Sequence, residues 1–384
     1  MSKVIYFTNA VSQTSFTDYL KRWKVSPNLS NQNFHNKVIK AISKFDKVEV
    51  ISIRPINKNF DVSSLPRLVE DEYNITWRYP KVSTSKVGKV LFLNKRIKQV
   101  SPLTNKDDVV LVDTLNLSLL KSAIKFAKKH SLKVYGVCTD NPNNISFIAD
   151  SYKNKLMKLG QSLDGYISLT KAITELYNVH NKPFIQIDGV SEDIEEIGKP
   201  LINDKYIYFG GSLMEEYGVY SLIDAFLRLK LKDTKLVICG HHLQKEKLFE
   251  KIKNNDSIVY LGPVSYFDNL TLEKNALLSV NPRPINQKID DYSIPSKTLE
   301  CLSIKCLNVT VDNALLKERY GDVIIWSKSS SSEDLAEAIN KALSLSKEEK
   351  DQIVENGYKK VMQRTSLKVI GEKIKSFLSK LLLD

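Results

Sequence analysis

Short apolar runs alternate with amphipathic segments along most of this chain, and the alternation constrains the fold more than any other feature of the sequence. In the first half, mostly apolar runs predict strands at 4–7, 48–53, 109–112, 134–138, 164–169 and 184–190. Apolar side chains at helical spacing predict helices at 34–45, capped by Asn33, and at 116–129 and 171–177. Residues 16–33 are expected to form an irregular surface excursion. Residues 54–106 give no clear pattern beyond a strand-like run at 90–93.

The second half repeats this architecture. Strands are predicted at 206–209, 236–239, 258–261, 276–280, 307–311 and 323–326. Helices are predicted at 219–229, 243–252, 266–274, 298–302, 333–343, 347–363 and 367–382, with the serine run 329–332 as a capping loop. Strands and helices that alternate in this way predict an α/β fold of two doubly wound, Rossmann-like parallel sheets.

The length of 384 residues exceeds the usual size of a single core and favours two domains. The acidic, structure-poor segment 191–204 is the predicted linker. We therefore expect an N-terminal domain over 1–198, completed by 364–384, and a C-terminal domain over 203–363. The last helix has one apolar face, which either packs back on the N-terminal domain or lies on a membrane surface. The carboxyl edges of two such sheets would face a central cleft, a favoured ligand site.

Positive charge is concentrated near the start of the chain. The formal net charge is +13, and residues 1–100 hold 18 Lys and Arg against 7 Asp and Glu, a difference of +11. Such a region suits an anionic partner, either acidic lipid headgroups or a lipid-linked phosphate, or it serves solubility alone. Nucleic acid is the least favoured partner because no nucleic-acid-binding motif is visible.

Two further observations concern the setting of the protein. No apolar run reaches the length of a membrane span and no secretion signal is visible, so a cytoplasmic protein is expected. The cysteines lack CxxC spacing and lie in or beside apolar segments, which favours core positions over disulfides or zinc ligands: Cys138, Cys239, Cys301 and Cys306.

Residues 281–300, which join a predicted strand to a predicted helix, are the main candidate for a binding site. Ligands bind at such junctions in open α/β sheets. Arg283 and Lys297 are suited to hold a diphosphate together with the helix N-terminus, and Glu300 to accept hydrogen bonds from a ribose. Ser296 and Thr298 are available, with Pro295, to start and cap the helix. The alternative is a loop with two surface cations.

Several motifs in the second half resemble a known family. They are Tyr-Phe-Gly-Gly-Ser-Leu-Met-Glu-Glu-Tyr-Gly-Val at 208–219, Leu-Ile-Asp-Ala-Phe at 222–226, Leu-Val-Ile-Cys-Gly at 236–240, Tyr-Leu-Gly at 260–262 and Pro-Ser-Lys-Thr-Leu-Glu at 295–300. In order and spacing they are similar to the donor domain of GT-B-fold glycosyltransferases, in particular glycosyltransferase family 4 (glycosyl transferases group 1). The first half resembles the family only in architecture and in fragments such as 164–170.

This resemblance implies transfer of a sugar from a nucleotide-diphosphate sugar, by default a UDP-sugar, to an acceptor hydroxyl. It implies retention of anomeric configuration and no metal or cofactor. Arg283 and Lys297 would neutralise the leaving diphosphate and Glu300 would bind the ribose. The remaining donor-binding residues implied lie in the loops that follow the strands: Gly210, Gly211, Ser212, His241, Tyr266, Ser296 and Thr298.

The sequence also departs from the family pattern. Ser212 and Tyr217 stand where family members often carry Arg and Lys, and Tyr292 stands where a glutamate often precedes Glu300 by eight residues. The histidine often found after the strand at 109–112 is missing. An inverting mechanism would need a base from the first half, for which Asp113 and Asp140 are the candidates. Each aspartate could instead be a helix cap or a turn residue.

Two other functions stay open from the sequence: a catalytically silent GT-B subunit that stabilises a partner transferase, and a sugar-nucleotide epimerase. The basic N-terminal region favours a lipid-linked acceptor at the inner face of the cell membrane, in the assembly of a cell-surface polysaccharide or glycoconjugate.

Overall fold

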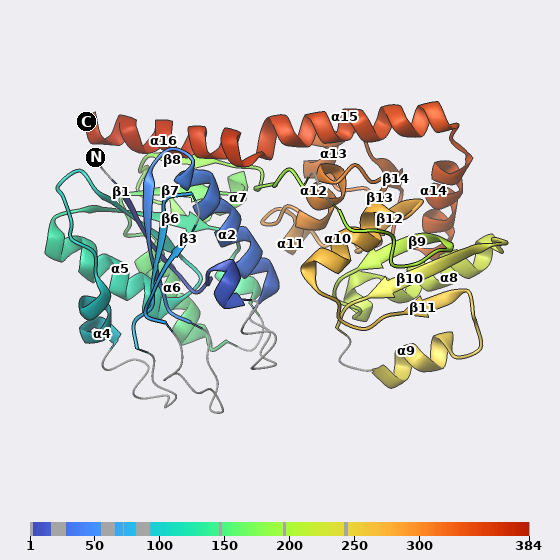
Figure 1. Cartoon of the computed structure of the whole chain (residues 1–384), viewed down its shortest axis with the longest axis horizontal. Helices are drawn as coiled ribbons and strands as arrows, with labels where there is room; N and C mark the ends of the chain where they lie inside the picture. Colours follow the sequence, from blue (N-terminus) through green and yellow to red (C-terminus); the bar gives the residue numbers. More distant parts are fainter. Residues whose placement is uncertain are drawn as a thin grey trace. The chain divides into compact units, whose positions relative to one another are not determined.

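The computed structural model describes residues 3–16, 28–54, 66–71, 73–81, 93–145, 148–194, 197–241 and 245–383 (Figure 1). The chain forms two compact units, each with its own sheet. Unit 1 comprises Met1–Val190, Asp291–Ser293 and Thr365–Asp384, and unit 2 comprises Ser191–Asp290 and Ile294–Arg364.

The sheet of unit 1 has the order β3-β4-β2-β1-β5-β6-β7-β8 among the described residues. Its strands pair in parallel, except that β3 is antiparallel to β4. Chain order reverses between β1 and β5, which creates a topological switch point. The strands are β1 (Lys3–Thr8), β2 (Lys47–Ser52), β3 (Leu68–Asp71), β4 (Ile75–Arg78), β5 (Val109–Asp113), β6 (Lys133–Cys138), β7 (Gly165–Ser168) and β8 (Phe184–Gln186).

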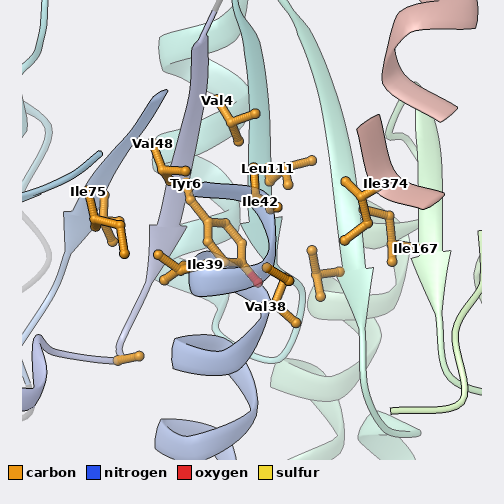
Figure 2. Packing of buried hydrophobic residues seen from close by; sticks show 14 of the residues in the cluster. Val4, Tyr6, Val38, Ile39, Ile42, Val48, Ile75, Leu111, Ile167 and Ile374 are labelled. Carbon is orange, nitrogen blue, oxygen red and sulfur yellow. The ribbon is translucent and has the colours of Figure 1, made fainter. Parts of the chain in front are cut away.

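Helices cover both faces of this sheet, so the central strands are apolar on both sides. Figure 2 shows Tyr6 of β1 with Val38 of one helix and Ile374 of another in a single cluster. Ile5 and Phe7 join a second cluster on the opposite face. The helical elements of unit 1 are α2 (Leu29–Ser43), α4 (Leu93–Val100), α5 (Leu117–His130), η1 (Pro142–Asn144), α6 (Asp150–Gly160), α7 (Lys171–Tyr177) and α16 (Leu367–Leu383).

The apolar face of α16 packs on unit 1, as one of the two interpretations of the sequence predicted. Ile370 and Ile374 are buried, and the close fit of Gly371 against α2 would not admit a Cβ, which would lie 2.2 Å from the Ala41 carbonyl oxygen. None of the helices in the described part of the chain is both long and apolar enough to cross a membrane.

Unit 2 has a fully parallel sheet in the order β11-β10-β9-β12-β13-β14, with the switch point between β9 and β12. The strands are β9 (Lys205–Gly210), β10 (Thr234–Cys239), β11 (Ile258–Tyr260), β12 (Leu278–Asn281), β13 (Asn308–Val311) and β14 (Ile325–Ser327). The helical elements are η2 (Glu215–Tyr217), α8 (Val219–Leu229), α9 (Lys245–Ile252), α10 (Tyr266–Lys274), α11 (Gln287–Asp290), α12 (Ser296–Ser303), α13 (Ala314–Tyr320), α14 (Ser332–Ser344) and α15 (Lys347–Thr365).

The structure confirms the predicted α/β class and most predicted elements, and it places all four cysteines in the interior without disulfides. The start predicted for the helix at 34–45 was wrong. α2 begins at Leu29, and the Asn28 side chain, not that of Asn33, accepts the capping hydrogen bond from the Asn31 amide. The first turn of α2 is polar apart from Leu29, so apolar spacing gave no signal there.

The hairpin β3–β4 and the helix α6 were not predicted. β3 is an exposed edge strand with two acidic residues, and only Leu156 and Gly160 of α6 are buried, so neither has a strong apolar pattern. Of the strand-like run at 90–93, residues 90–92 lie outside the described residues and Leu93 begins α4. Of the predicted excursion at 16–33, residues 17–27 likewise lie outside the described residues, and 29–33 belong to α2.

Candidate functional site

The switch point of unit 2 brings two loops together. β9 ends at Gly210 and β12 ends at Asn281, and the two strands pair directly, Tyr208 opposite Ser279. In open α/β sheets the loops that leave such neighbouring strands diverge to opposite faces of the sheet, and ligands bind in the crevice at its carboxyl edge. The 281–300 segment and the Gly210–Gly211 turn, which the sequence singled out separately, therefore belong to one site.

The Gly210–Gly211 turn is closely packed. The Gly211 amide donates to the Cys239 carbonyl oxygen at 2.8 Å, and the Leu213 amide donates to the His241 carbonyl oxygen at 2.9 Å. Gly211 has φ of 154°, and a Cβ there would lie 1.4 Å from Lys297 Nζ. Glycine at this position lets the lysine ammonium approach the backbone of the turn.

Lys297 lies in the first turn of α12, and its side chain reaches back to this turn. Its Nζ donates a hydrogen bond to the Gly210 carbonyl oxygen and lies 5.1 Å from the centroid of the Phe209 ring. Burial lowers the pKa of Lys297, and the nearby Glu273, Cys239 and Glu300 partly oppose that effect. The result is a cation in a low-dielectric environment at the switch point, where its interaction with an anion is strong.

Arg283, two residues after β12, is held by a carboxylate. Its Nη2 lies 3.2 Å from Asp290 Oδ1, and Asp290 Oδ2 accepts the Asn286 amide at 2.7 Å. The side chains of Arg283 and Asp290 are only 21% and 13% exposed. A small pocket adjoins the pair, lined also by Asn281, Pro295 and other residues at the ends of β12 and β13.

Glu300 lies one turn after Lys297 in α12. The Tyr266 hydroxyl donates to Glu300 Oε1 at 2.7 Å, and both burial and the Glu300 carboxylate raise the pKa of Tyr266. The tyrosine hydroxyl is therefore a fixed donor that orients the carboxylate of Glu300.

The other residues predicted for this site are dispersed around it. Ser296 is the exposed first residue of α12, and Pro295 is its N-cap without a side-chain capping bond, so the capping expected from Ser296 or Thr298 is not observed. Thr298 is fully buried, and its hydroxyl has no hydrogen-bond partner among the described residues. Ser212 is half-buried after Gly211, and His241 is exposed after Gly240.

The candidate bases of the first half lie at the carboxyl ends of two neighbouring strands of unit 1: Asp113 is the last residue of β5, and Asp140 follows β6 by two residues. Asp113 is 1% exposed. It accepts hydrogen bonds from the side-chain Nδ2 of Asn31 at 3.1 Å and from the backbone amide of Leu115 at 2.9 Å, and its Oδ2 lies 3.4 Å from His35 Nε2. Burial raises the pKa of Asp113, but the charge of His35 and these hydrogen bonds outweigh it, so the pKa is lowered.

Asp140 is half-buried, and its Oδ1 accepts the Asn141 amide at 2.7 Å. The bonds from Leu115 to Asp113 and from Asn141 to Asp140 are local contacts of the kind expected for turn residues, whereas the contacts of Asp113 with Asn31 and His35 join β5 to α2. Their role as catalytic bases stays a prediction.

Comparison with known proteins agrees with this architecture. Residues 191–360 match the family model described as glycosyl transferases group 1. We refer to residues 191–360, which are similar to this family, as the group 1 domain. No curated protein sequence matches the chain.

Solved structures with the GT-B fold match nearly the whole chain. A sucrose-phosphate synthase from Thermosynechococcus elongatus has 10% sequence identity and a TM-score of 0.70, with 99% of each chain covered. An α,α-trehalose 6-phosphate synthase from Burkholderia multivorans has 12% identity and a TM-score of 0.69, covering 100% of this chain and 99% of the other. The Anabaena protein HepE in complex with UDP and glucose has 12% identity and a TM-score of 0.66, covering 98% and 99%. The chain has the GT-B fold.

Two buried polar side chains of the group 1 domain were not predicted from the sequence as part of the site. The Tyr208 hydroxyl lies on β9 beneath Gly210, 2.9 Å from Asn269 Oδ1 and 2.7 Å from Cys239 Sγ. Glu273 lies on α10 and is 5% exposed. The sequence did contain an indication of its burial: Glu273 lies on the same face of α10 as Leu270, which faces the core. A buried carboxylate needs a partner, so its position there already points to function.

Proposed function

We propose that this protein is a glycosyltransferase that moves a sugar from a nucleotide-diphosphate sugar to an acceptor hydroxyl. The observation that carries the proposal is the Lys297 ammonium held against the Gly210–Gly211 turn at the switch point of the group 1 domain. A mostly buried cation beside a glycine turn and a helix N-terminus is suited to a diphosphate. The Anabaena HepE structure, a complex with UDP and glucose, supports a uridine diphosphate sugar as the donor.

In this proposal each group has a defined task. Lys297 and Arg283 stabilise the negative charge that develops on the diphosphate as the glycosidic bond breaks, which is charge stabilisation by preorganised cations. Glu300, oriented by Tyr266, accepts hydrogen bonds from the ribose hydroxyls. The glycines allow the phosphates to approach the backbone amides.

We further propose that the reaction retains the anomeric configuration, with the leaving phosphate oxygen accepting the proton of the acceptor hydroxyl on the same face of the sugar. This scheme needs no separate protein base, metal or cofactor. It is supported by the resemblance to the family and by the hydrogen bonds that already engage the carboxylates of Asp113 and Asp140.

The test is a panel of nucleotide sugars incubated with the full chain, with release of nucleoside diphosphate measured with and without simple sugar acceptors. We expect slow release with one donor and faster release when a suitable acceptor is added, with a product anomer that matches the donor. A protein that binds no donor in the panel would contradict the proposal, and a silent subunit would bind a donor without turnover. Direct conversion of the donor to its epimer would indicate an epimerase.

The acceptor is proposed to be lipid-linked and to meet the cytoplasmic enzyme at the anionic inner face of the membrane, in the assembly of a surface polysaccharide. Support comes from α4 and α5, two helices of unit 1 that contain no acidic residue. Both contribute apolar side chains to the same hydrophobic cluster, the one that contains Ile5 and Phe7. Leu103, between these helices in sequence, is 92% exposed. Exposed lysines of the two helices and their connection are Lys95, Lys98, Lys106, Lys121, Lys125, Lys128 and Lys129.

Full-length protein is therefore expected to sediment with vesicles that contain phosphatidylserine at low salt and to be released at high salt. Each lysine near such a surface contributes about 1 kcal/mol. Replacing Lys121, Lys125, Lys128 and Lys129 by glutamine should weaken vesicle binding at least tenfold. The same change at four exposed lysines of unit 2, Lys328, Lys341, Lys347 and Lys359, removes equal charge and should have little effect. Equal losses in both variants would mean that net charge alone is responsible.

A further inference from the structure

Glu273 is a buried carboxyl group beneath the candidate donor site that the proposed chemistry leaves without a task. It lies near the end of α10, with a relative exposure of 5%. Its Oε1 accepts a hydrogen bond of 2.6 Å from the hydroxyl of Ser279, which belongs to β12 and is also buried. Glutamate is seldom fully buried unless a partner or a function stabilises it.

Ionisable groups surround Glu273 on each neighbouring element. From α12 it interacts with Lys297, Glu300 and Cys301, and from its own helix with Tyr266. Tyr208 of β9 and Cys239 of β10 also respond to its charge. Among the anionic groups that act on Lys297, Glu273 acts most strongly. Any change of charge at the donor site is therefore transmitted to this carboxyl group.

Burial raises the pKa of Glu273 to about 8, and the neighbouring Glu300 carboxylate acts in the same direction. The Ser279 hydroxyl, the Lys297 ammonium and the Cys301 thiol oppose this shift. Glu273 therefore changes charge in the pH range in which the protein can be studied, whereas an ordinary glutamate is ionised throughout it.

We propose that Glu273 is the proton-linked residue of the donor site, which takes up a proton from solvent when a nucleoside diphosphate binds beside Lys297. The proposal rests on the proposed function, because it requires the diphosphate to bind at the Gly210–Gly211 turn. In the empty site, an ionised Glu273 balances the charge of Lys297. When the diphosphate arrives, it supplies that balance itself, and the negative charge beneath it becomes unfavourable.

The sign of the pH dependence follows from this exchange. A bound diphosphate favours protonated Glu273, so binding is unaffected by Glu273 well below pH 8, where the group is already protonated. Above pH 8 binding must be accompanied by proton uptake, and affinity falls by up to tenfold per pH unit. Glutamine at this position mimics the protonated state and still accepts the hydrogen bond from Ser279.

The experiment measures UDP binding to the full-length protein by calorimetry from pH 7.0 to 9.0, with GDP, ADP and dTDP as further probes. Wild-type protein should bind the preferred diphosphate more weakly as pH rises above 8. Measured near pH 8 in buffers of different ionisation enthalpy, its binding should show uptake of a substantial fraction of one proton. Glu273→Gln should bind as the wild type does at pH 7.0, bind several-fold more tightly at pH 8.5 to 9.0, and show much smaller proton uptake.

Two controls separate the outcomes. Ser279→Ala removes the hydrogen bond but leaves the carboxyl group, so it should retain the proton uptake. Glu273→Gln should also melt at a higher temperature than the wild type at pH 9, because the raised pKa makes ionisation of Glu273 in the folded protein unfavourable. Binding without pH dependence, or an equal loss of affinity in Glu273→Gln at every pH, would overturn the role of Glu273 while leaving the proposed function intact. Absence of binding by every diphosphate would overturn both.

Discussion

Replacement of Lys297 by alanine is expected to lower kcat/KM for sugar transfer by about a thousandfold, within the range seen when a preorganised group that stabilises transition-state charge is removed. The reason is geometric. The Lys297 ammonium is fixed against the Gly210 carbonyl oxygen and over the Phe209 ring, so it requires no reorganisation when the diphosphate leaves. The measurement is steady-state transfer with the donor identified from the panel, together with UDP affinity.

The matched control is Lys328→Ala, which removes an exposed lysine of the same unit and should leave turnover unchanged. Circular dichroism and thermal melting of Lys297→Ala should show a folded protein, because the site lies at the edge of the sheet. Full activity in a folded Lys297→Ala variant would mean that the donor phosphates bind elsewhere. Arg283→Ala should also lower turnover, but Asp290 would then lose its partner, so its effect combines catalysis with local structure.

The sequence predicted those parts of the fold in which apolar periodicity is strong. The bounds of α7, α8 and α10 agree with the predicted ranges, and α8 buries Val219, Leu222, Ile223, Ala225 and Phe226 on one face. Prediction failed for elements held by few or polar contacts. The turn between β3 and β4 places Tyr73 and Asn74 at positive φ, which a sequence of this kind does not signal.

The candidate site was predicted in part for a similar reason. Gly211 stands in a loop and Lys297 in a first helical turn, where glycine and charge are visible against a polar background, and Glu300 lies one turn further along the same helix. These residues come together because β9 and β12 are neighbours at the switch point of the sheet. The strand order shows this, whereas the motifs alone do not show which strands are neighbours. No role in the site was predicted for Glu273 or Tyr208, because they lie within a helix and a strand, where the sequence does not distinguish buried polar side chains from surface residues.

The contact between the buried side chains of Tyr6 and His35 in unit 1 also could not be predicted from the sequence. The Tyr6 hydroxyl lies 2.6 Å from His35 Nδ1, and His35 Nε2 faces Asp113. These residues come from β1, α2 and β5, which are far apart in sequence. The histidine often found in the family after the strand at 109–112 is missing here, yet the fold brings His35 of α2 to Asp113, the last residue of β5.

Replacement of Gly240 by alanine is expected to destabilise unit 2 by about 4 kcal/mol or more, a size that indicates a severe steric conflict. Gly240 has φ of 139°, and a Cβ there would lie 1.6 Å from the Gly211 carbonyl oxygen. The Gly211 carbonyl oxygen belongs to the backbone of a donor-site loop, so no side-chain movement relieves the clash. The conflict can be relieved only by displacing the Gly211 turn, and UDP affinity should fall together with stability.

Gly262 provides the matched comparison at the next strand end. It has φ of 71°, and nothing lies within 4 Å of a Cβ placed there. Gly262→Ala should therefore cost only about 1 to 2 kcal/mol, the conformational penalty for a side chain in the left-handed region. Urea unfolding of both variants, with UDP binding measured in parallel, separates steric conflict from backbone preference. If both variants lost the same stability, backbone conformation alone would explain why glycine stands at both positions. The close packing between the β9 and β10 loops would then not account for glycine at position 240.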